Sequence, residues 1–160
     1  MTRETHRSTK DREGETILDL ETYVPFLLSV AAAAWTRTTS AEYRAHFGLG
    51  ITDWRVISML NIEPKITANR ICQVIHMDKA AVSRALHTLS EAGIVAFDAP
   101  KQNPRNRTWW LTDKGRGLHA DILGVALEHE AKMMAGVAGE DLDTFLSVLR
   151  RMHVNLSAKS

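Results

Sequence analysis

The stretch "ITANRICQVIHMDKAAVSRALHTLSEAGIVAF" (Ile66–Phe97) decides the fold of this chain of 160 residues. Thr67 precedes one run of helical residues and Asp78 precedes a second. Both residue types are favoured at helix N-termini, because their side chains accept hydrogen bonds from free backbone N–H groups. Only residues 76–78 separate the two runs, and Gly93 ends the second. Two short helices joined so closely predict a helix-turn-helix.

The second predicted helix has one apolar and one polar face. Its apolar stripe, which is expected to be buried, consists of Val82, Ala85, Leu86 and Leu89. Its polar face consists of Ala80, Ser83, Arg84, His87, Thr88 and Glu91. On that face the small Ala80 lets a DNA backbone approach closely, and Arg84 can form a bidentate pair with guanine. An ordinary solvated helix face has the same composition, so this helix alone does not establish DNA binding.

A β-hairpin is predicted directly after this helix. "IVAF" (Ile94–Phe97) and "TWWL" (Thr108–Leu111) are short apolar runs with β-branched and aromatic residues, and residues 98–107 between them have the composition of a loop. A strand, a loop and a strand after a helix-turn-helix form a wing. The loop holds three basic residues, Lys101, Arg105 and Arg107. Such a loop suits an arm laid along a phosphate backbone or into a minor groove.

Two adjacent tryptophans in the second strand must point to opposite faces, because strand side chains alternate. We expect Trp109 and Leu111 to face the core, together with Phe97 or Ile94. Trp110 is then expected to face outward or to pack against a neighbouring helix.

The rest of the chain is predicted to be helical. Residues 18–46 form one long alanine-rich helix, bent or begun near Pro25 and ended by the glycines of "FGLG". Thr52 is expected to cap a helix over 53–60, and Thr112 a long helix after the wing. The last helix has an apolar stripe that needs a partner, either the first helix of the same chain or another chain. That stripe consists of Leu142, Phe145, Leu146, Leu149 and Met152.

These patterns predict a mainly α fold with a small β-wing, in which the N- and C-terminal helices form a helical dimerisation region. We expect a disordered N-terminal tail over residues 1–16 and an N-terminal dimerisation helix over 17–48. A winged helix-turn-helix DNA-binding domain is expected over 49–116, followed by C-terminal dimerisation helices over 117–160.

The positive charge is concentrated in the centre of the chain. The net charge is only +1, but residues 65–116 hold nine Lys and Arg against four Asp and Glu, a local balance of +5. An interface for an acidic partner has such a balance, and so has an ordinary solvated surface.

Membrane, secreted and enzyme classes are disfavoured. The longest apolar run, Val24–Trp35, contains Pro25 and Ser29 and is too short to span a bilayer. The polar start, Met1–Glu15, lacks the apolar centre of a signal peptide, so we predict a cytoplasmic protein with no membrane partner. The sequence has no GxSxG, phosphate-loop or HExxH motif, so we predict no enzyme activity and no cofactor.

The single cysteine, Cys72, excludes an intramolecular disulfide and a multi-cysteine zinc site. It shares helical spacing with Ala68, Ile71 and Ile75, so we expect a small buried hydrophobe, with redox sensing as the alternative. His76 lies four residues on and would supply half of a metal site. No third ligand accompanies the pair, so no metal is predicted.

Three segments follow one another in a definite order: "ITDWRVISML" (51–60), the stretch 66–97, and "NPRNRTWWLTDKGRGL" (103–118). In this order and spacing they resemble the MarR family of bacterial winged-helix transcription regulators, from about Leu49 to Leu118. "DKAAVSRAL", the strand entry "AGIV" and "LTDKG" after the wing carry most of the resemblance. It implies a homodimer whose two lobes lie over successive major grooves of a palindromic operator.

The resemblance also assigns roles to residues. It makes 79–92 the recognition helix and Arg105 the wing arginine. The family usually has an aspartate two residues before that arginine, where this chain has Asn103, so the ion pair that braces the wing is reduced to at most a hydrogen bond. The predicted contacts with double-stranded DNA are Thr67, Asn69, Lys79, Ala80, Ser83, Arg84, His87, Lys101, Arg105 and Arg107.

Regulators that resemble this family often respond to small anionic or aromatic ligands, bound between the dimerisation helices and the DNA-binding lobe. Aromatic residues next to arginines suit an aromatic carboxylate or an acyl thioester. The predicted contacts with such an effector are Trp35, Arg37, Tyr43, Arg44, His46, Trp54 and Arg55.

We therefore predict a transcription regulator that binds a palindromic operator as a homodimer, represses, and is released by a small ligand. One alternative is a redox- or metal-responsive regulator of the same fold, for which Cys72 is the only candidate residue. The other is a winged-helix module that binds protein, which would lack the salt dependence of phosphate contacts.

Overall fold

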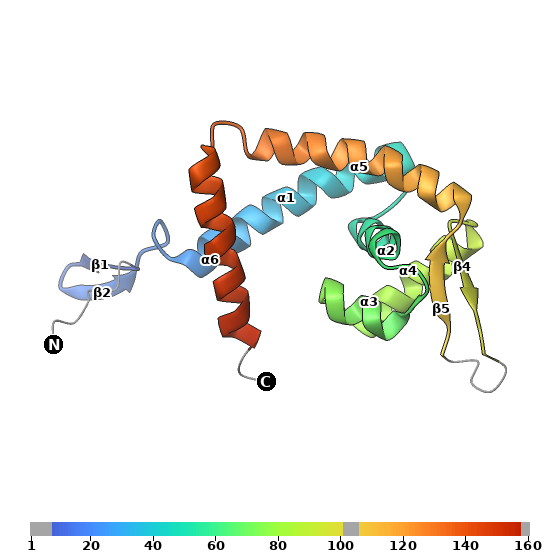
Figure 1. Ribbon diagram of the computed structural model, residues 1–160. Helices are drawn as coiled ribbons and strands as arrows, with labels where there is room; N and C mark the ends of the chain where they lie inside the picture. The colour runs from blue at the N-terminus through green and yellow to red at the C-terminus, as the bar shows by residue number, and fades with distance from the viewer. Residues whose placement is uncertain (1–7, 101–105, 158–160) are drawn as a thin grey trace. The chain divides into compact units, whose positions relative to one another are not determined.

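The computed structural model describes residues 8–100 and 106–157, and it is mostly helical with small antiparallel sheets (Figure 1). The predicted mainly α fold with a β-wing is confirmed. The chain divides into two compact units, residues 1–123 and 124–160. None of the helices in the described ranges has the length and apolar character that crossing a bilayer requires.

The long first helix, α1 (Val24–Phe47), begins at its proline and does not bend there. Pro25 occupies the first turn, where its missing N–H costs no hydrogen bond. Gly48 ends the helix in the left-handed conformation at φ +68°, as the glycines predicted. Residues 18–23, which were included in the predicted helix, lie outside it. The buried residues of α1, Thr39, Ser40 and Tyr43, all belong to its C-terminal half.

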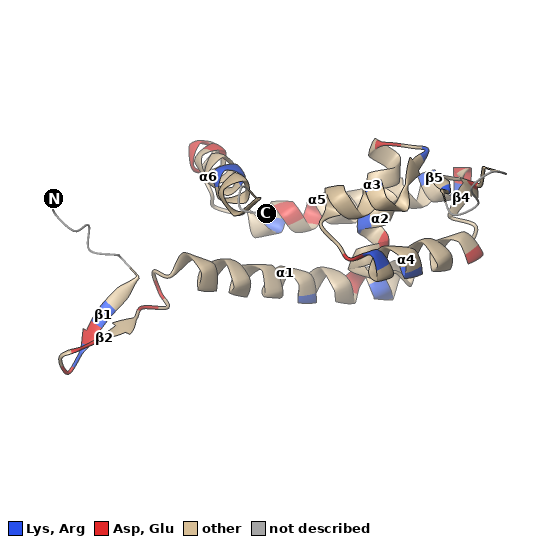
Figure 2. Cartoon of the chain, turned by 90° about the horizontal axis from the view of Figure 1, so that it is seen from below, with Lys and Arg blue, Asp and Glu red and all other residues tan. Residues whose placement is uncertain are grey.

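The segment before α1 is a β-hairpin, which corrects the disordered tail predicted over residues 1–16; residues 1–7 lie outside the described ranges. Strand β1 (Thr9–Arg12) pairs antiparallel with β2 (Glu15–Leu18). Glu13 and Gly14 both have positive φ, which gives the two-residue turn that suits a hairpin. Acidic and basic residues lie together on the strands (Figure 2). That polar composition led to the prediction of disorder, whereas the turn residues favour pairing.

The helix-turn-helix is confirmed as α3 (Ala68–Ile75) followed by α4 (Lys79–Glu91). Thr67 Oγ1 accepts a hydrogen bond from the Arg70 N–H at 3.3 Å, as predicted for the cap of α3. Asp78 Oδ1 accepts one from the Ala81 N–H at 2.8 Å and caps α4. His76 turns the chain between the two helices in the left-handed conformation, at φ +51°.

Helix α2 (Ile51–Ile62) begins before the cap predicted for it. Gly50 is the N-cap, and its N–H donates to Asp53 Oδ2 at 2.8 Å. Thr52 is therefore inside the first turn and does not cap the helix.

The core of the helix-turn-helix lobe lies where α2, α3 and α4 pack together (Figure 1). Val56, Ile57, Ile71, Val82 and Leu89 are completely shielded from solvent. The whole stripe predicted on the second helix of the helix-turn-helix is buried. Arg70 on α3 also forms a salt bridge of 3.0 Å with Glu63 at the end of α2, which fixes α3 against α2.

The wing is a three-stranded antiparallel sheet in the order β3-β5-β4. The predicted strands are confirmed as β4 (Val95–Asp98) and β5 (Thr108–Leu111). The third strand, β3 (Ile66–Thr67), was missed because two residues are too few to show alternation. Trp109 and Leu111 are buried as predicted, with Ile94 beside them in the core. Trp110 is half-buried, and its ring centroid lies 6.0 Å from Lys65 Nζ.

The wing is fastened where α5 (Asp113–Met133) begins. Thr112 Oγ1 accepts from the Gly115 N–H at 3.1 Å, which confirms it as the cap of α5. The same hydroxyl donates to the Gly93 carbonyl at 2.8 Å, just after α4. Lys114 Nζ donates to the Ala92 carbonyl at 2.8 Å. The end of α4 and the start of α5 are thereby joined.

Candidate nucleic-acid interface

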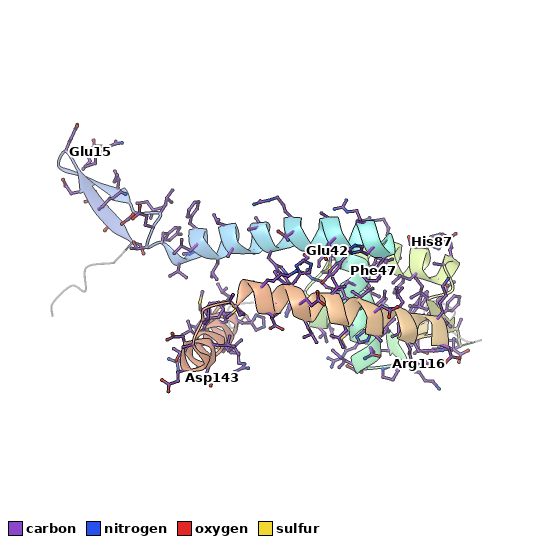
Figure 3. The ribbon with its side chains drawn as sticks, turned by 90° about the horizontal axis from the view of Figure 1, so that it is seen from above. Glu15, Glu42, Phe47, His87, Arg116 and Asp143 are labelled. Carbon is purple, nitrogen blue, oxygen red and sulfur yellow. The ribbon has the colours of Figure 1, made fainter. Side chains whose placement is uncertain are left out.

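The polar face of α4 is exposed along its whole length. Every residue predicted for it, from Ala80 to Glu91, is open to solvent, and His87, labelled in Figure 3, lies on this face. His87 Nε2 is 3.5 Å from Glu91 Oε1, one helical turn further on. The helix therefore presents small, basic and hydrogen-bonding side chains outward while its apolar stripe holds it on the core.

A groove of about 790 Å³ runs between α3, α4 and the wing. Seven of the ten predicted DNA contacts line it: Thr67, Asn69, Lys79, Ser83, Arg84, His87 and Arg107. Ala80 is exposed on α4 but does not line the groove. Lys101, Arg105 and Asn103 lie outside the described residues. Residues that are distant in sequence thus come together in one concave surface.

The groove is electropositive. Lys79, Arg84 and Arg107 have no salt-bridge partner among residues 8–100 and 106–157. Cations without an internal partner remain available for phosphate oxygens, with which arginine forms charge-assisted bidentate hydrogen bonds. The surface therefore suits a polyanion that follows the groove.

Six of the residues that line the groove were not predicted as contacts, and Phe97 and Asn106 are two of them. Phe97 was considered for the core, but it is 37% exposed and lines the groove. Asn106 lines the groove next to Arg107. Alternation along β4, where Val95 is buried, would have placed Phe97 on the same side as Val95. The two residues lie on the same side of β4 but differ in exposure, 3% for Val95 and 37% for Phe97, and the strand pattern does not show this difference.

The predicted effector contacts do not gather in this groove. Tyr43 and Trp54 are neighbours, with ring centroids 6.2 Å apart, and Trp54 stacks on His119 at 5.3 Å. Trp35 is half-buried. The remaining four candidates, Arg37, Arg44, His46 and Arg55, are exposed. His46 Nδ1 lies 3.9 Å from Oε1 of Glu42, which Figure 3 labels on α1.

His119 gives the stability of this unit a pH dependence. This residue is 9% exposed, and burial lowers its pKa below the ordinary value of 6.5. The unfolded chain therefore binds this proton more readily than the folded chain. The contribution of His119 to stability is complete above about pH 6.5 and is lost as the pH falls through 6.5 towards the lowered pKa.

We predict that denaturant titrations at pH 7.5 and 5.5 will show a loss of unfolding free energy at the lower pH. In His119→Phe, which keeps an aromatic ring against Trp54 but cannot be protonated, the loss should be smaller. An equal pH dependence in the two proteins would assign the effect to other histidines.

Cys72 is half-buried on α3, and His76 is exposed at the end of the same helix. Within the described part of the chain, no three His, Cys, Asp or Glu side chains lie close enough to hold a metal ion. The core position expected for Cys72 is reached only in part, because the buried face of α3 centres on Ile71.

Residues 47–102 match the sequence model of the MarR family. The HTH-type transcriptional regulator TcaR of Staphylococcus aureus (strain Newman) is 29% identical over 118 residues, which cover 72% of this chain and 78% of TcaR. A MarR/EmrR family regulator from Acinetobacter sp. ADP1 has a TM-score of 0.80 at 23% identity, covering 88% of this chain and 99% of its own. Bordetella bronchiseptica BpsR, whose DNA binding is regulated by 6-hydroxynicotinic acid, has a TM-score of 0.76 at 17% identity, over 86% of this chain and 97% of BpsR. The fold, the exposed helix α4 and these matches agree: the chain has the fold of MarR-family transcriptional regulators, and its residues 47–102 match the sequence model of that family.

Proposed function

We propose that this chain is a cytoplasmic homodimeric repressor that binds a palindromic operator in double-stranded DNA and is released by a small ligand. The observation that carries the proposal is the groove in which seven predicted DNA contacts from α3, α4 and the wing meet. In the proposed complex α4 enters the major groove, and the basic residue at the base of the wing follows the backbone.

Exposed apolar surface on two helices supports a homodimer. Val24, Phe26, Leu27 and Val30 of α1 are 39% to 49% exposed. In α6 (Gly139–Ser157) none of the described residues is buried, and Phe145 and Val148 are nearly half exposed. Apolar surface of this extent is costly in water, and a second copy of the chain would cover it. A two-fold axis would then place two recognition helices on an inverted repeat.

The aromatic cluster of Tyr43, Trp54 and His119 supports the effector part of the proposal. It joins α1, α2 and α5, so a ligand that separates these rings would change how α2 is held against the other two helices. The regulation of BpsR by an aromatic carboxylate is consistent with an effector of that class. The ligand would act by favouring dimers whose recognition helices are wrongly spaced for DNA.

Selection of bound fragments from random DNA by the purified protein tests the proposal. We expect enrichment of an inverted repeat with half-sites about one helical turn apart and an affinity that falls steeply with salt. Sedimentation of the free protein should show a dimer. If a monomeric protein enriched a single half-site, the proposed homodimer would be refuted, while the proposed DNA binding would stand. Failure of a folded dimer to enrich any sequence would favour the protein-binding alternative.

A further inference from the structure

Three side chains form a continuous stack from the core of the wing to the groove. Trp109, which is 7% exposed, lies beneath Phe97 with ring centroids 4.8 Å apart. The guanidinium carbon of Arg107 lies 4.4 Å from the centroid of the Phe97 ring. All three residues line the groove. The innermost member is anchored in the core, and the outermost carries a positive charge.

The backbone explains why this stack forms. Phe97 and Trp109 are directly paired across β4 and β5, so their side chains leave the sheet on the same face. Arg107 immediately precedes β5, where the strand fixes its starting point but not its long side chain. No carboxylate among residues 8–100 and 106–157 forms a salt bridge with it. The face of Phe97 is therefore the contact that directs the guanidinium.

We infer that Phe97 is a positioning residue for DNA binding, whose ring holds Arg107 in the groove so that the guanidinium meets a backbone phosphate of the bound duplex. An arginine ordered in the free protein loses less side-chain freedom on binding than one that moves freely in solvent. A cation over an aromatic ring also keeps its N–H groups pointing outward at the ring edge, where they can donate to phosphate. The inference rests on DNA binding alone and needs neither the dimer nor the effector.

Phosphate contact is favoured over base contact by the position of Arg107. It lies at the base of the wing and not on α4, whose Ser83 and Arg84 occupy the part of the groove suited to base edges. Its effect on affinity should therefore be similar for different DNA sequences and should depend on salt.

The test is a double-mutant cycle with Phe97→Leu and Arg107→Ala, measured on a mixed-sequence duplex of about 30 base pairs at several salt concentrations. Phe97→Leu removes the ring and keeps an apolar side chain. We expect it to weaken binding about two- to fivefold, the value of an exposed cation–π contact. Arg107→Ala should lower the salt slope by about one. With Arg107 already replaced, Phe97→Leu should have no further effect.

Two conservative variants separate positioning from packing. Phe97→Tyr keeps the ring and should retain the affinity of the unmodified protein. Arg107→Lys keeps the charge without the planar guanidinium that stacks on the ring, so its affinity should be less sensitive to Phe97→Leu than that of the unmodified protein. Thermal unfolding of each variant shows whether the wing is intact. If Phe97→Leu unfolds the wing, the inference is tested by comparing the DNA affinities of Phe97→Tyr and Arg107→Lys instead.

The inference is overturned if Phe97→Leu weakens binding equally with and without Arg107, because Phe97 would then act through Trp109 alone. It is also overturned if Phe97→Tyr binds as weakly as Phe97→Leu. If the unmodified protein binds no duplex, the inferred contact between Arg107 and a phosphate does not exist. That last result would count against DNA binding as a whole, whereas the first two leave it intact.

Discussion

Replacing Gly115 by alanine is expected to destabilise the protein by about 2 to 3 kcal/mol, although the position lies in the first turn of α5. A Cβ at this position would lie 2.1 Å from the Ile94 carbonyl oxygen and 3.2 Å from its carbon. That oxygen already accepts hydrogen bonds from the Thr112 N–H at 3.0 Å and its hydroxyl at 3.1 Å. The backbone cannot move away without breaking the junction between wing and helix.

Gly117→Ala is the matched control, since Gly117 lies two residues further along the same helix with no atom near its Cβ position. There alanine should stabilise the protein by about 0.5 to 1 kcal/mol through its greater helix propensity. Urea unfolding of both variants measures the two effects, which have opposite signs. Stabilisation of both would show that the close approach of α5 to Ile94 is not maintained in solution.

Replacing Arg84 by alanine is expected to cost about 1 to 3 kcal/mol of binding energy on the preferred DNA site, roughly five- to 150-fold in affinity. Arg84 is exposed on α4, lines the groove and has no salt-bridge partner in the described residues. In the major groove its guanidinium would pair with the O6 and N7 acceptors of guanine. The loss should be much smaller on unrelated duplexes.

Competition binding with the selected operator and with single-base variants of it measures this effect. Thr88→Ala is a suitable control, because Thr88 is exposed on the same helix but does not line the groove. Its affinity should stay close to that of the unmodified protein. A uniform loss across all sequences in Arg84→Ala would instead make Arg84 a phosphate contact.

The sequence predicted those parts of the fold that depend on residues near one another. Thr67, Asp78 and Thr112 act as the expected caps because a cap requires only a side-chain oxygen and the following turn. Strand β3 could not be predicted in this way, since its two residues are ordered by pairing with Trp109 and Thr108, far along the chain. Thr52 does not cap α2 because the helix begins earlier, with Gly50 as its N-cap and Asp53 bonded to the Gly50 N–H.

The candidate site was predictable to a similar extent. Helical spacing placed Ser83, Arg84 and His87 on the outward face of α4, and this is a property of one element. The stack of Arg107 on Phe97 depends on the pairing of two strands across a loop, so composition could not reveal it. The effector contacts were proposed from the family resemblance and from residue type, and they remain a prediction.

The hydroxyl of Thr112 donates a hydrogen bond to the Gly93 carbonyl just after α4, and this contact affects how the sequence of the wing can change in evolution. Because both ends of the hairpin are fastened at one place, the loop between them can change length with little effect on the rest of the lobe. Closing a loop of twice the length costs only about 0.6 kcal/mol. In the proposed complex, the length of the wing loop along DNA and the bases contacted by α4 could therefore change by separate mutations, so that DNA specificity would change one step at a time.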